Sequence, residues 1–115
     1  MSRLMMAVAV SLLLVGCAHD PDIRAGRDNT FGMTAKSPPE YLNCVKAELP
    51  DSAKTYVVQN QDALELFVAS TDPDKAEGLV RVQGSTGRQQ FSAYQRDAWY
   101  DKGRLLDAAL MCSRV

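Results

Sequence analysis

The sequence predicts a small α+β domain: an N-terminal helix, a four-stranded antiparallel meander, and a C-terminal helix packed with the first on one face of the sheet. Three observations lead to this prediction: a helix-start motif at Ser37, β-rich segments separated by turn residues between positions 54 and 95, and a helical period near the C-terminus. The 115 residues suit one domain, and 46% apolar with 23% charged residues is typical of a folded chain.

The first helix is expected over residues 38–48. Ser37 provides a side-chain cap, prolines are tolerated in the first turn, and Glu40 completes a capping box. Pro50 ends the helix. One face of it carries, at helical spacing, Tyr41, Cys44, Val45 and Leu49. Cys44 is therefore expected to point inward.

Four strands are expected in two hairpins. Residues 54–70 are broken by Asn60-Gln61-Asp62, and residues 79–83 and 89–95 flank the turn Gly84-Ser-Thr-Gly87. Alternation along the strands predicts one face made of Tyr56, Val58, Leu64, Leu66, Val68, Val80, Val82 and Phe91.

The last helix is expected over residues 96–113. Its inward arc, at about 100° per residue, holds Ala98, Trp99, Leu105, Leu106, Ala109, Leu110 and Cys112. Two inward cysteines, Cys44 and Cys112, predict a disulfide that joins the two helices if the chain is exported, because the periplasm is oxidising. A redox or metal site is disfavoured, since the chain has no Cys-x-x-Cys pair and no histidine near these cysteines.

The N-terminus carries an export signal. Arg3 precedes the apolar run 4–15, which is too short to span a bilayer, and Leu14-Val15-Gly16-Cys17 follows. This tetrad resembles the lipobox of bacterial lipoproteins. The resemblance implies that residues 1–16 are a signal peptide that is removed, and that Cys17 receives a diacylglyceryl thioether and an amino-terminal acyl chain. Because Ala18, and not aspartate, follows Cys17, it also implies the periplasmic leaflet of the outer membrane rather than the inner membrane.

The domain itself is similar to a loose set of small proteobacterial envelope lipoproteins. The similarity covers residues 40–113 and consists of an early Cys44-Val45, a helix containing Trp99, and a late Cys112. No functional residue is carried over from it.

Residues 17–36 are expected to be the lipidated cysteine and a flexible tether, and residues 37–115 the domain. The stretch AHDPDIRAGRDNTFGMTAK has no sustained period and mixes Pro, Gly, Asp and Asn. Its nineteen residues would reach roughly 65 Å when fully extended and about 24 Å as a flexible chain.

Charge and residue types limit the function. Removal of Arg3 with the signal peptide leaves twelve basic against fourteen acidic residues, scattered along the chain, which argues against nucleic acid as a partner. His19 is the only histidine and lies in the expected tether, so Ser-His-Asp and Cys-His chemistry and a zinc site are disfavoured. We expect no enzyme activity, no cofactor and no metal.

The remaining functional prediction is a protein-binding module in the cell envelope, as an assembly accessory or an inhibitor. Its expected surface is the sheet face away from the helices, with Val57, Phe67, Arg81 and Tyr94 as contacts and Glu65, Gln90 and Ser92 beside them. The competing interpretation is that Phe67 and Tyr94 pack at the sheet edge. The alternative function is binding or hydrolysis of cell-wall glycan, through Glu65 with Asp97 or Asp101 and through the aromatic residues Tyr94, Trp99 and Tyr100.

Overall fold

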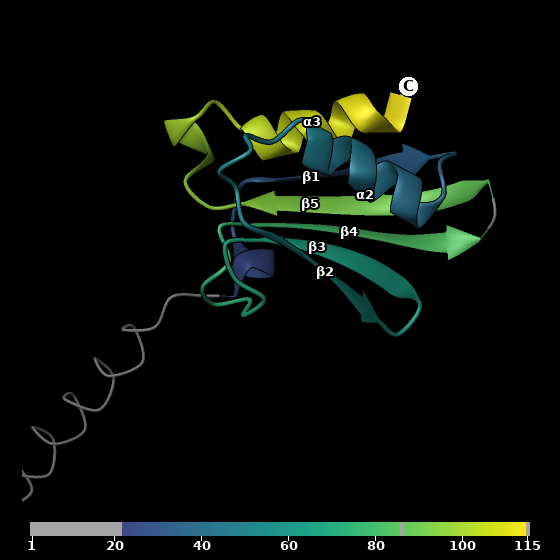
Figure 1. The fold of residues 1–115 in the computed structure, drawn as a ribbon, viewed down its shortest axis with the longest axis horizontal. Coiled ribbons are helices and arrows are strands. Elements are labelled where there is room, and N and C mark those ends of the chain that lie inside the picture. Colours follow the sequence, from purple (N-terminus) through teal and green to yellow (C-terminus); the bar gives the residue numbers. More distant parts are fainter. Residues whose placement is uncertain (1–21, 86, 115) are drawn as a thin grey trace, which may run out of the picture.

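Five antiparallel strands and two α-helices form the part of the chain that the computed structural model describes, residues 22–85 and 87–114 (Figure 1). The elements, in chain order, are η2 (Ile23–Ala25), β1 (Asn29–Thr34), α2 (Pro38–Ala47), β2 (Thr55–Asn60), β3 (Ala63–Val68), β4 (Gly78–Ser85), β5 (Arg88–Gln95), η3 (Ala98–Tyr100) and α3 (Arg104–Arg114). The predicted α+β class is confirmed.

The sheet has the strand order β1-β5-β4-β3-β2, and every neighbouring pair is antiparallel. Strands β2 to β5 form the predicted meander. The predicted count of four strands was wrong, because β1 adds a fifth strand beside β5 from a segment that we expected to be tether. From β1 the chain crosses the sheet through α2 and enters β2 at the opposite edge.

Strand β1 has little sequence signal because the side chains that it turns toward the helices are small. Thr30, Gly32 and Thr34 lie opposite Ala93, Phe91 and Gln89, whereas Phe31 and Met33 point to the other face and are exposed. A Cβ on Gly32 would come within 2.9 Å of the Phe91 ring. The strand thus pairs closely with β5 without the apolar alternation that marks most strands.

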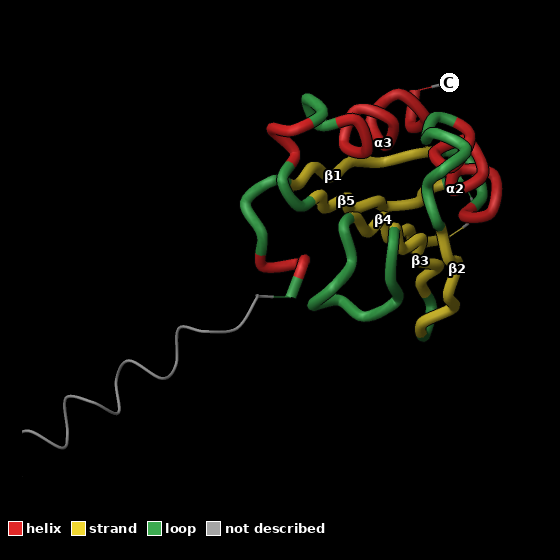
Figure 2. Tube along the Cα trace, turned by 60° about the vertical axis from the view of Figure 1, so that its left-hand side comes forward, coloured by secondary structure: helices red, strands yellow, loops and turns green. Residues whose placement is uncertain are grey.

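Both helices cover one face of the sheet, as predicted (Figure 2). Ser37 caps α2 by accepting a hydrogen bond from the Glu40 N–H. α2 packs over β3 and β4, and α3 packs over β1 and β5. The core between helices and sheet consists of Tyr41, Leu42, Val45, Leu66, Val80, Val82, Phe91, Ala93, Leu105, Ala108, Ala109 and Cys112.

The predicted disulfide between Cys44 and Cys112 is confirmed. The two sulfur atoms are 2.07 Å apart and the Cα atoms 5.8 Å apart, with the residues separated by 68 positions in the chain. The bridge therefore fastens α2 to α3 covalently, within the layer that covers the sheet.

The last helix begins at Arg104, eight residues later than predicted. Lys102 and Gly103 have φ values of 61° and 72°, in the left-handed region that interrupts an α-helix. Asp101 then caps α3, because its side chain accepts a hydrogen bond from the Arg104 N–H at 3.3 Å. Trp99 consequently belongs to η3 and is 78% exposed, so its predicted place in the core was wrong.

The predicted face of strand β2 was also wrong. Only Gln61 and Asp62 form the turn to β3, and Asn60 lies opposite Ala63. Val57 therefore shares a face with Leu66, on the helix side, while Tyr56 and Val58 lie opposite Phe67 and Glu65 on the other side. A shift of one residue in a strand moves all its side chains to the opposite face.

Candidate functional site

The sheet face without α-helices is not an open binding surface at its centre. Residues of η2 and of the loop between β3 and β4 cover it (Figure 2). Ile23, Phe67, Ala76 and Leu79 form a second buried cluster there, with Val58 and Tyr94 packed against it. Phe67 is 4% exposed. Phe67 therefore packs in the core, but on the inner strand β3 and not at the sheet edge that the competing interpretation named.

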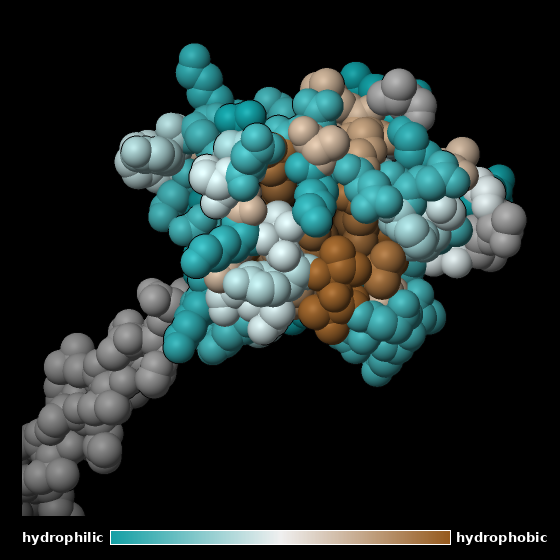
Figure 3. Space-filling model, viewed as in Figure 1, coloured by the Kyte–Doolittle hydropathy of each residue, from teal (hydrophilic) through white to brown (hydrophobic). Residues whose placement is uncertain are grey.

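The four predicted contact residues do not form one surface. Arg81 and Tyr94 are half-buried on the η2-covered face, near the buried Phe67. Val57 is 54% exposed but lies on the helix side, in the uncovered edge strand β2. Apolar surface is visible there beside α2 (Figure 3).

A cleft at one end of the sheet is the better candidate for a functional site. It has a volume of about 440 Å³ and is bordered by the end of β3, the start of β4, the end of β5, the segment after α2, and the start of α3. Its lining residues are Leu49, Pro50, Ala53, Val68, Glu77, Gly78, Gln95, Arg96, Asp97, Trp99, Tyr100, Asp101, Arg104 and Leu105. This mixture of apolar and polar groups is usual for ligand sites.

Two exposed aromatic rings stand at this cleft. Trp99 is 78% and Tyr100 82% exposed, and their rings meet edge to face with centroids 6.0 Å apart. Large aromatic side chains that are this exposed are uncommon on a small domain and are frequent contacts in interfaces. Both residues were named from the sequence as possible glycan contacts, but the wrong helix boundary placed Trp99 in the core. The Lys102-Gly103 stop was the signal in the sequence that could have revealed the exposure of Trp99.

Short-range hydrogen bonds fix the backbone that carries these rings. The Gln95 side chain donates to Asp101 Oδ1 at 2.7 Å and accepts from the N–H groups of Leu105 and Leu106. The Gly103 N–H donates to the Ala98 carbonyl at 2.8 Å. Ala98 itself is 7% exposed, so η3 is anchored through it.

Hydrogen bonds also hold the side chain of Arg96, which lines the cleft, in a fixed position. Arg96 donates through Nε to the Ala76 carbonyl at 2.7 Å and through its guanidinium to the Pro73 carbonyl at 2.9 Å. Its side chain ties the β3–β4 loop to the end of β5. Both walls of the cleft therefore belong to one connected scaffold.

The carboxylates proposed for glycan hydrolysis are separated. Asp97 and Asp101 line the cleft together with Glu77. Glu65 is 2% exposed on the η2-covered face of the sheet, where its oxygens accept from Asn60 and Arg24. The carboxylate of Glu65 is thus buried and engaged in contacts within the fold, and it does not share a site with Asp97 or Asp101.

Other predicted sites lie partly outside the described residues. Cys17 and His19 both belong to the stretch 1–21 and so fall outside the part of the chain that the structure describes. Within residues 22–85 and 87–114, no group of three or more His, Cys, Asp or Glu side chains is arranged to hold a metal ion. None of the helices in these two ranges is long and apolar enough to cross a membrane.

No family model, no curated protein and no solved structure matches this chain.

Proposed function

We propose that the protein is a lipid-anchored periplasmic lipoprotein that binds another envelope protein without catalysing a reaction. The observation that carries the proposal is how the three cysteines are divided. Cys44 and Cys112 are joined in a disulfide, which suits an oxidising compartment, and Cys17 is the one cysteine left. That cysteine stands at the end of the lipobox-like Leu14-Val15-Gly16-Cys17.

Membrane fractionation tests the anchor. Wild-type protein is expected to sediment with membranes and to resist carbonate washing, because several acyl chains hold a protein far more firmly than one. Cys17→Ser is expected to leave the protein uncleaved or soluble. The matched control is the double variant Cys44→Ser/Cys112→Ser, which keeps Cys17 and should stay in the membrane fraction. A cleaved Cys17→Ser protein that resists the carbonate wash as well as wild type would contradict the proposal.

The outer membrane is the proposed location. Position 18 is alanine, where aspartate would resemble an inner-membrane retention signal. We expect wild-type protein in the denser outer-membrane fraction of a sucrose gradient and Ala18→Asp in the lighter inner-membrane fraction. Co-migration of both proteins with the inner membrane would contradict the outer-membrane assignment.

The cleft at Trp99 and Tyr100 is the proposed contact for the protein partner. Its support is the exposure of both rings on a backbone that hydrogen bonds hold in place, since aromatic anchors on rigid elements dominate many interfaces. A photo-crosslinking residue at position 100, in the living cell, should give a discrete adduct that Trp99→Ala abolishes. The same residue at exposed position 62, at the far end of the sheet, is the control. Equal adducts from both positions would contradict a specific contact.

Cell-wall glycan is the second candidate ligand. Trp99 and Tyr100 present apolar ring faces, and Glu77, Asp97 and Asp101 offer hydrogen-bond acceptors beside them, a combination that suits sugar hydroxyls and ring C–H groups. Retention on purified peptidoglycan, lost in Trp99→Ala, would favour the glycan. If wild-type protein hydrolyses peptidoglycan and Asp97→Asn or Asp101→Asn does not, the protein is a glycan hydrolase.

A further inference from the structure

The segment that follows the proposed anchor is docked onto the domain. Ile23 is 2% exposed and packs with Phe67, Ala76 and Leu79. Its N–H donates to the Pro73 carbonyl at 3.0 Å. Burial of an apolar side chain of this size favours the docked state over an exposed one. The chain at Ile23 is therefore part of the fold and not of a free linker.

Polar contacts reinforce the docking. Arg24 pairs with Asp22 at 3.2 Å and with the buried carboxylate of Glu65 at 3.3 Å. A few residues later, the Gln95 N–H donates to the Asp28 carbonyl at 3.0 Å and β1 begins its pairing with β5. From Asp22 onward the backbone is thus fastened to the sheet at successive points.

Few residues lie between the proposed anchor and the docked segment. Four residues, 18–21, separate Cys17 from Asp22. Five residue steps span at most about 18 Å, against roughly 65 Å for the nineteen-residue tether that the sequence alone suggested. A lipid on Cys17 would keep the point at which the chain joins the domain within that distance of the membrane surface.

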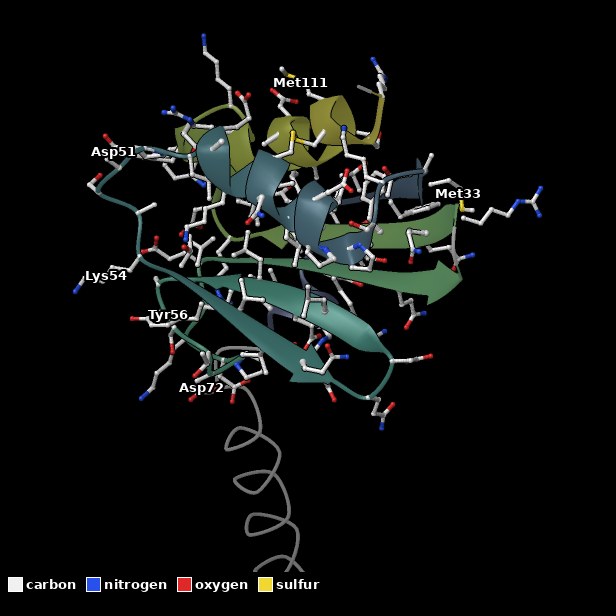
Figure 4. All side chains as sticks on the ribbon, turned by 45° about the vertical axis from the view of Figure 1, so that its right-hand side comes forward. Met33, Asp51, Lys54, Tyr56, Asp72 and Met111 are labelled. Atoms are coloured by element: carbon white, nitrogen blue, oxygen red, sulfur yellow. A yellow bond between two sulfur atoms is a disulfide. The ribbon has the colours of Figure 1, made fainter. Side chains whose placement is uncertain are left out.

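The point of attachment lies on one particular side of the molecule. η2 and the β3–β4 loop lie on the side of the sheet opposite to α2 and α3 (Figure 2). Asp72, in that loop, and Met111, on α3, lie on opposite sides of the sheet in Figure 4. We call the side that carries η2 the anchor face.

The anchor face also exposes apolar side chains. Phe31 and Met33 are 77% and 51% exposed, and the β1–β5 register places them on the same face as Ser92 and Gln90, away from the helices. Phe31 is two residues, about 7 Å, along the strand from Asn29, where the docked segment joins the sheet. The surrounding charges are mixed, with Arg24, Arg27 and Lys75 near Asp22, Asp28 and Asp74.

We propose that the anchor face rests on the membrane, with Phe31 and Met33 in contact with the lipid interface, and that the helix layer and η3, which carries Trp99, point away from it (Figure 1). The inference rests on the proposed lipidation of Cys17. The occupant of the exposed apolar patch is the bilayer because the lipid-bearing residue is held within about 18 Å of this face. Because charges of both signs surround the docked segment, electrostatic attraction to lipid headgroups contributes little and burial of apolar side chains stabilises the contact. High salt should therefore not release the anchor face from the membrane.

Tryptophan quenching by brominated lipid tests the orientation. The chain has one tryptophan, Trp99, so wild-type protein reports on the cleft and Phe31→Trp in a Trp99→Phe background reports on the anchor face. Full-length lipidated protein is placed in phosphatidylcholine vesicles with and without bromine on the acyl chains. We expect emission about twofold lower with bromine for the Phe31→Trp variant, as for a ring at the headgroup boundary, and nearly unchanged emission for wild type.

Two further variants keep the test decisive. Met33→Trp in the same background should be quenched as well and substitutes for the first variant if that one fails to fold by circular dichroism. Insertion of ten Gly/Ser residues between Pro21 and Asp22 should weaken the quenching at position 31. Equal quenching at positions 31 and 99, quenching at 99 alone, or quenching unaffected by the insertion would overturn the proposal.

Mass analysis separates this inference from the proposed function. A bare Cys17 in the purified protein would refute the anchor itself. A lipidated Cys17 together with unquenched emission from the Phe31→Trp variant would leave the anchor intact and refute only the orientation. If that unquenched variant also crosslinks through position 31 to another protein, the anchor face is assigned to a protein partner instead.

Discussion

Glu65 is a buried acidic side chain on the middle of the sheet, with 2% exposure and two arginines around it. Arg24 lies 3.3 Å from its carboxylate and Arg81 3.7 Å. Arg24 belongs to the docked segment and Arg81 to β4. The carboxylate of Glu65 therefore links the docked segment to the sheet. A buried carboxylate needs such partners because an unpaired charge in the interior is costly.

Replacing this carboxylate should loosen the docked segment. We expect Glu65→Gln to lower the free energy of unfolding by about 1–3 kcal/mol, because the amide cannot hold both guanidinium groups. Amide exchange at Ile23 should accelerate more than exchange at Val80 in the helix-side core. Asp107→Asn, at an exposed position of α3, is the matched control and should change neither. A uniform change in exchange would contradict the link between Glu65 and η2.

Tyr41 should give the fold a dependence on alkaline pH. Its hydroxyl donates to the Ala109 carbonyl at 2.6 Å, and burial raises the pKa of Tyr41 well above the ordinary 10.0. The phenol stays neutral in the folded protein while that of the unfolded chain ionises. Its contribution to stability is therefore complete below about pH 10 and declines as the pH rises further.

The variant Tyr41→Phe isolates this effect. Near neutral pH it should be less stable than wild type by about 1 kcal/mol, since the hydrogen bond to Ala109 is lost. Above about pH 10 the wild type should lose stability more steeply, so the difference narrows. Urea unfolding of both proteins between about pH 7 and 11 measures this difference in the free energy of unfolding. A constant difference over that range would show that Tyr41 titrates alike in both states.

Residue properties explain which single positions were predictable. Ser37, Cys44 and Cys112 have roles that follow from local spacing, and the structure confirms the cap and the bridge. The face of Val57 was misplaced because it depends on whether the turn after β2 has two or three residues. That detail is decided by pairing with β3 and not by composition. Phe67 was placed on the correct face, but the segment that buries it there comes from the expected tether.

At the scale of elements, the disulfide joins two helices that are distant in sequence. Closing a loop of 68 residues should contribute about 4 kcal/mol on the chain-entropy account. We expect Cys44→Ala/Cys112→Ala to lower the urea midpoint strongly, and reduction of wild type to lower it to a similar value. If the double variant unfolds at the same urea concentration as oxidised wild type, the bridge is not a main source of stability.

The first turn of helix α3 lies close to the sheet at Gly78. A Cβ at this position would overlap Leu105 Cδ2 and lie 3.3 Å from Val68 Cγ2. Because Leu105 is buried, we expect Gly78→Ala to destabilise the fold by about 1–3 kcal/mol. In a Leu105→Ala background the same substitution should cost less, and equal costs in both backgrounds would contradict the close approach.

The elements that were predicted from sequence share strong local signals. Turn residues mark the four strands of the meander, and a capping motif marks α2. Strand β1 was not predicted because its core-side residues are small and because it is an edge strand. Only its pairing with β5 defines it. The start of α3 was predicted too early because the apolar helical period continues back to Ala98 and Trp99. The left-handed backbone at Lys102 and Gly103 nevertheless prevents an α-helix from continuing through this stretch.

At the scale of the whole molecule, the structure shortens the link between the proposed anchor and the domain. Docking of Ile23 and pairing of β1 convert most of the expected tether into fold. The 3-10 helix η3, which carries Trp99, lies on the helix side of the sheet (Figure 1), so that a partner can reach this ring on the side away from the proposed membrane contact. The sequence alone could not predict this arrangement, because the docking depends on the far-separated Phe67, Pro73 and Leu79.

The mass of the mature protein isolated from its native membranes tests the central claim most directly. We predict an N-terminus at Cys17 that carries a diacylglyceryl thioether and an amide-linked acyl chain, with Cys44 and Cys112 oxidised. A free thiol at Cys17, or an N-terminus elsewhere in the chain, would contradict the proposed anchor and the membrane orientation that depends on it.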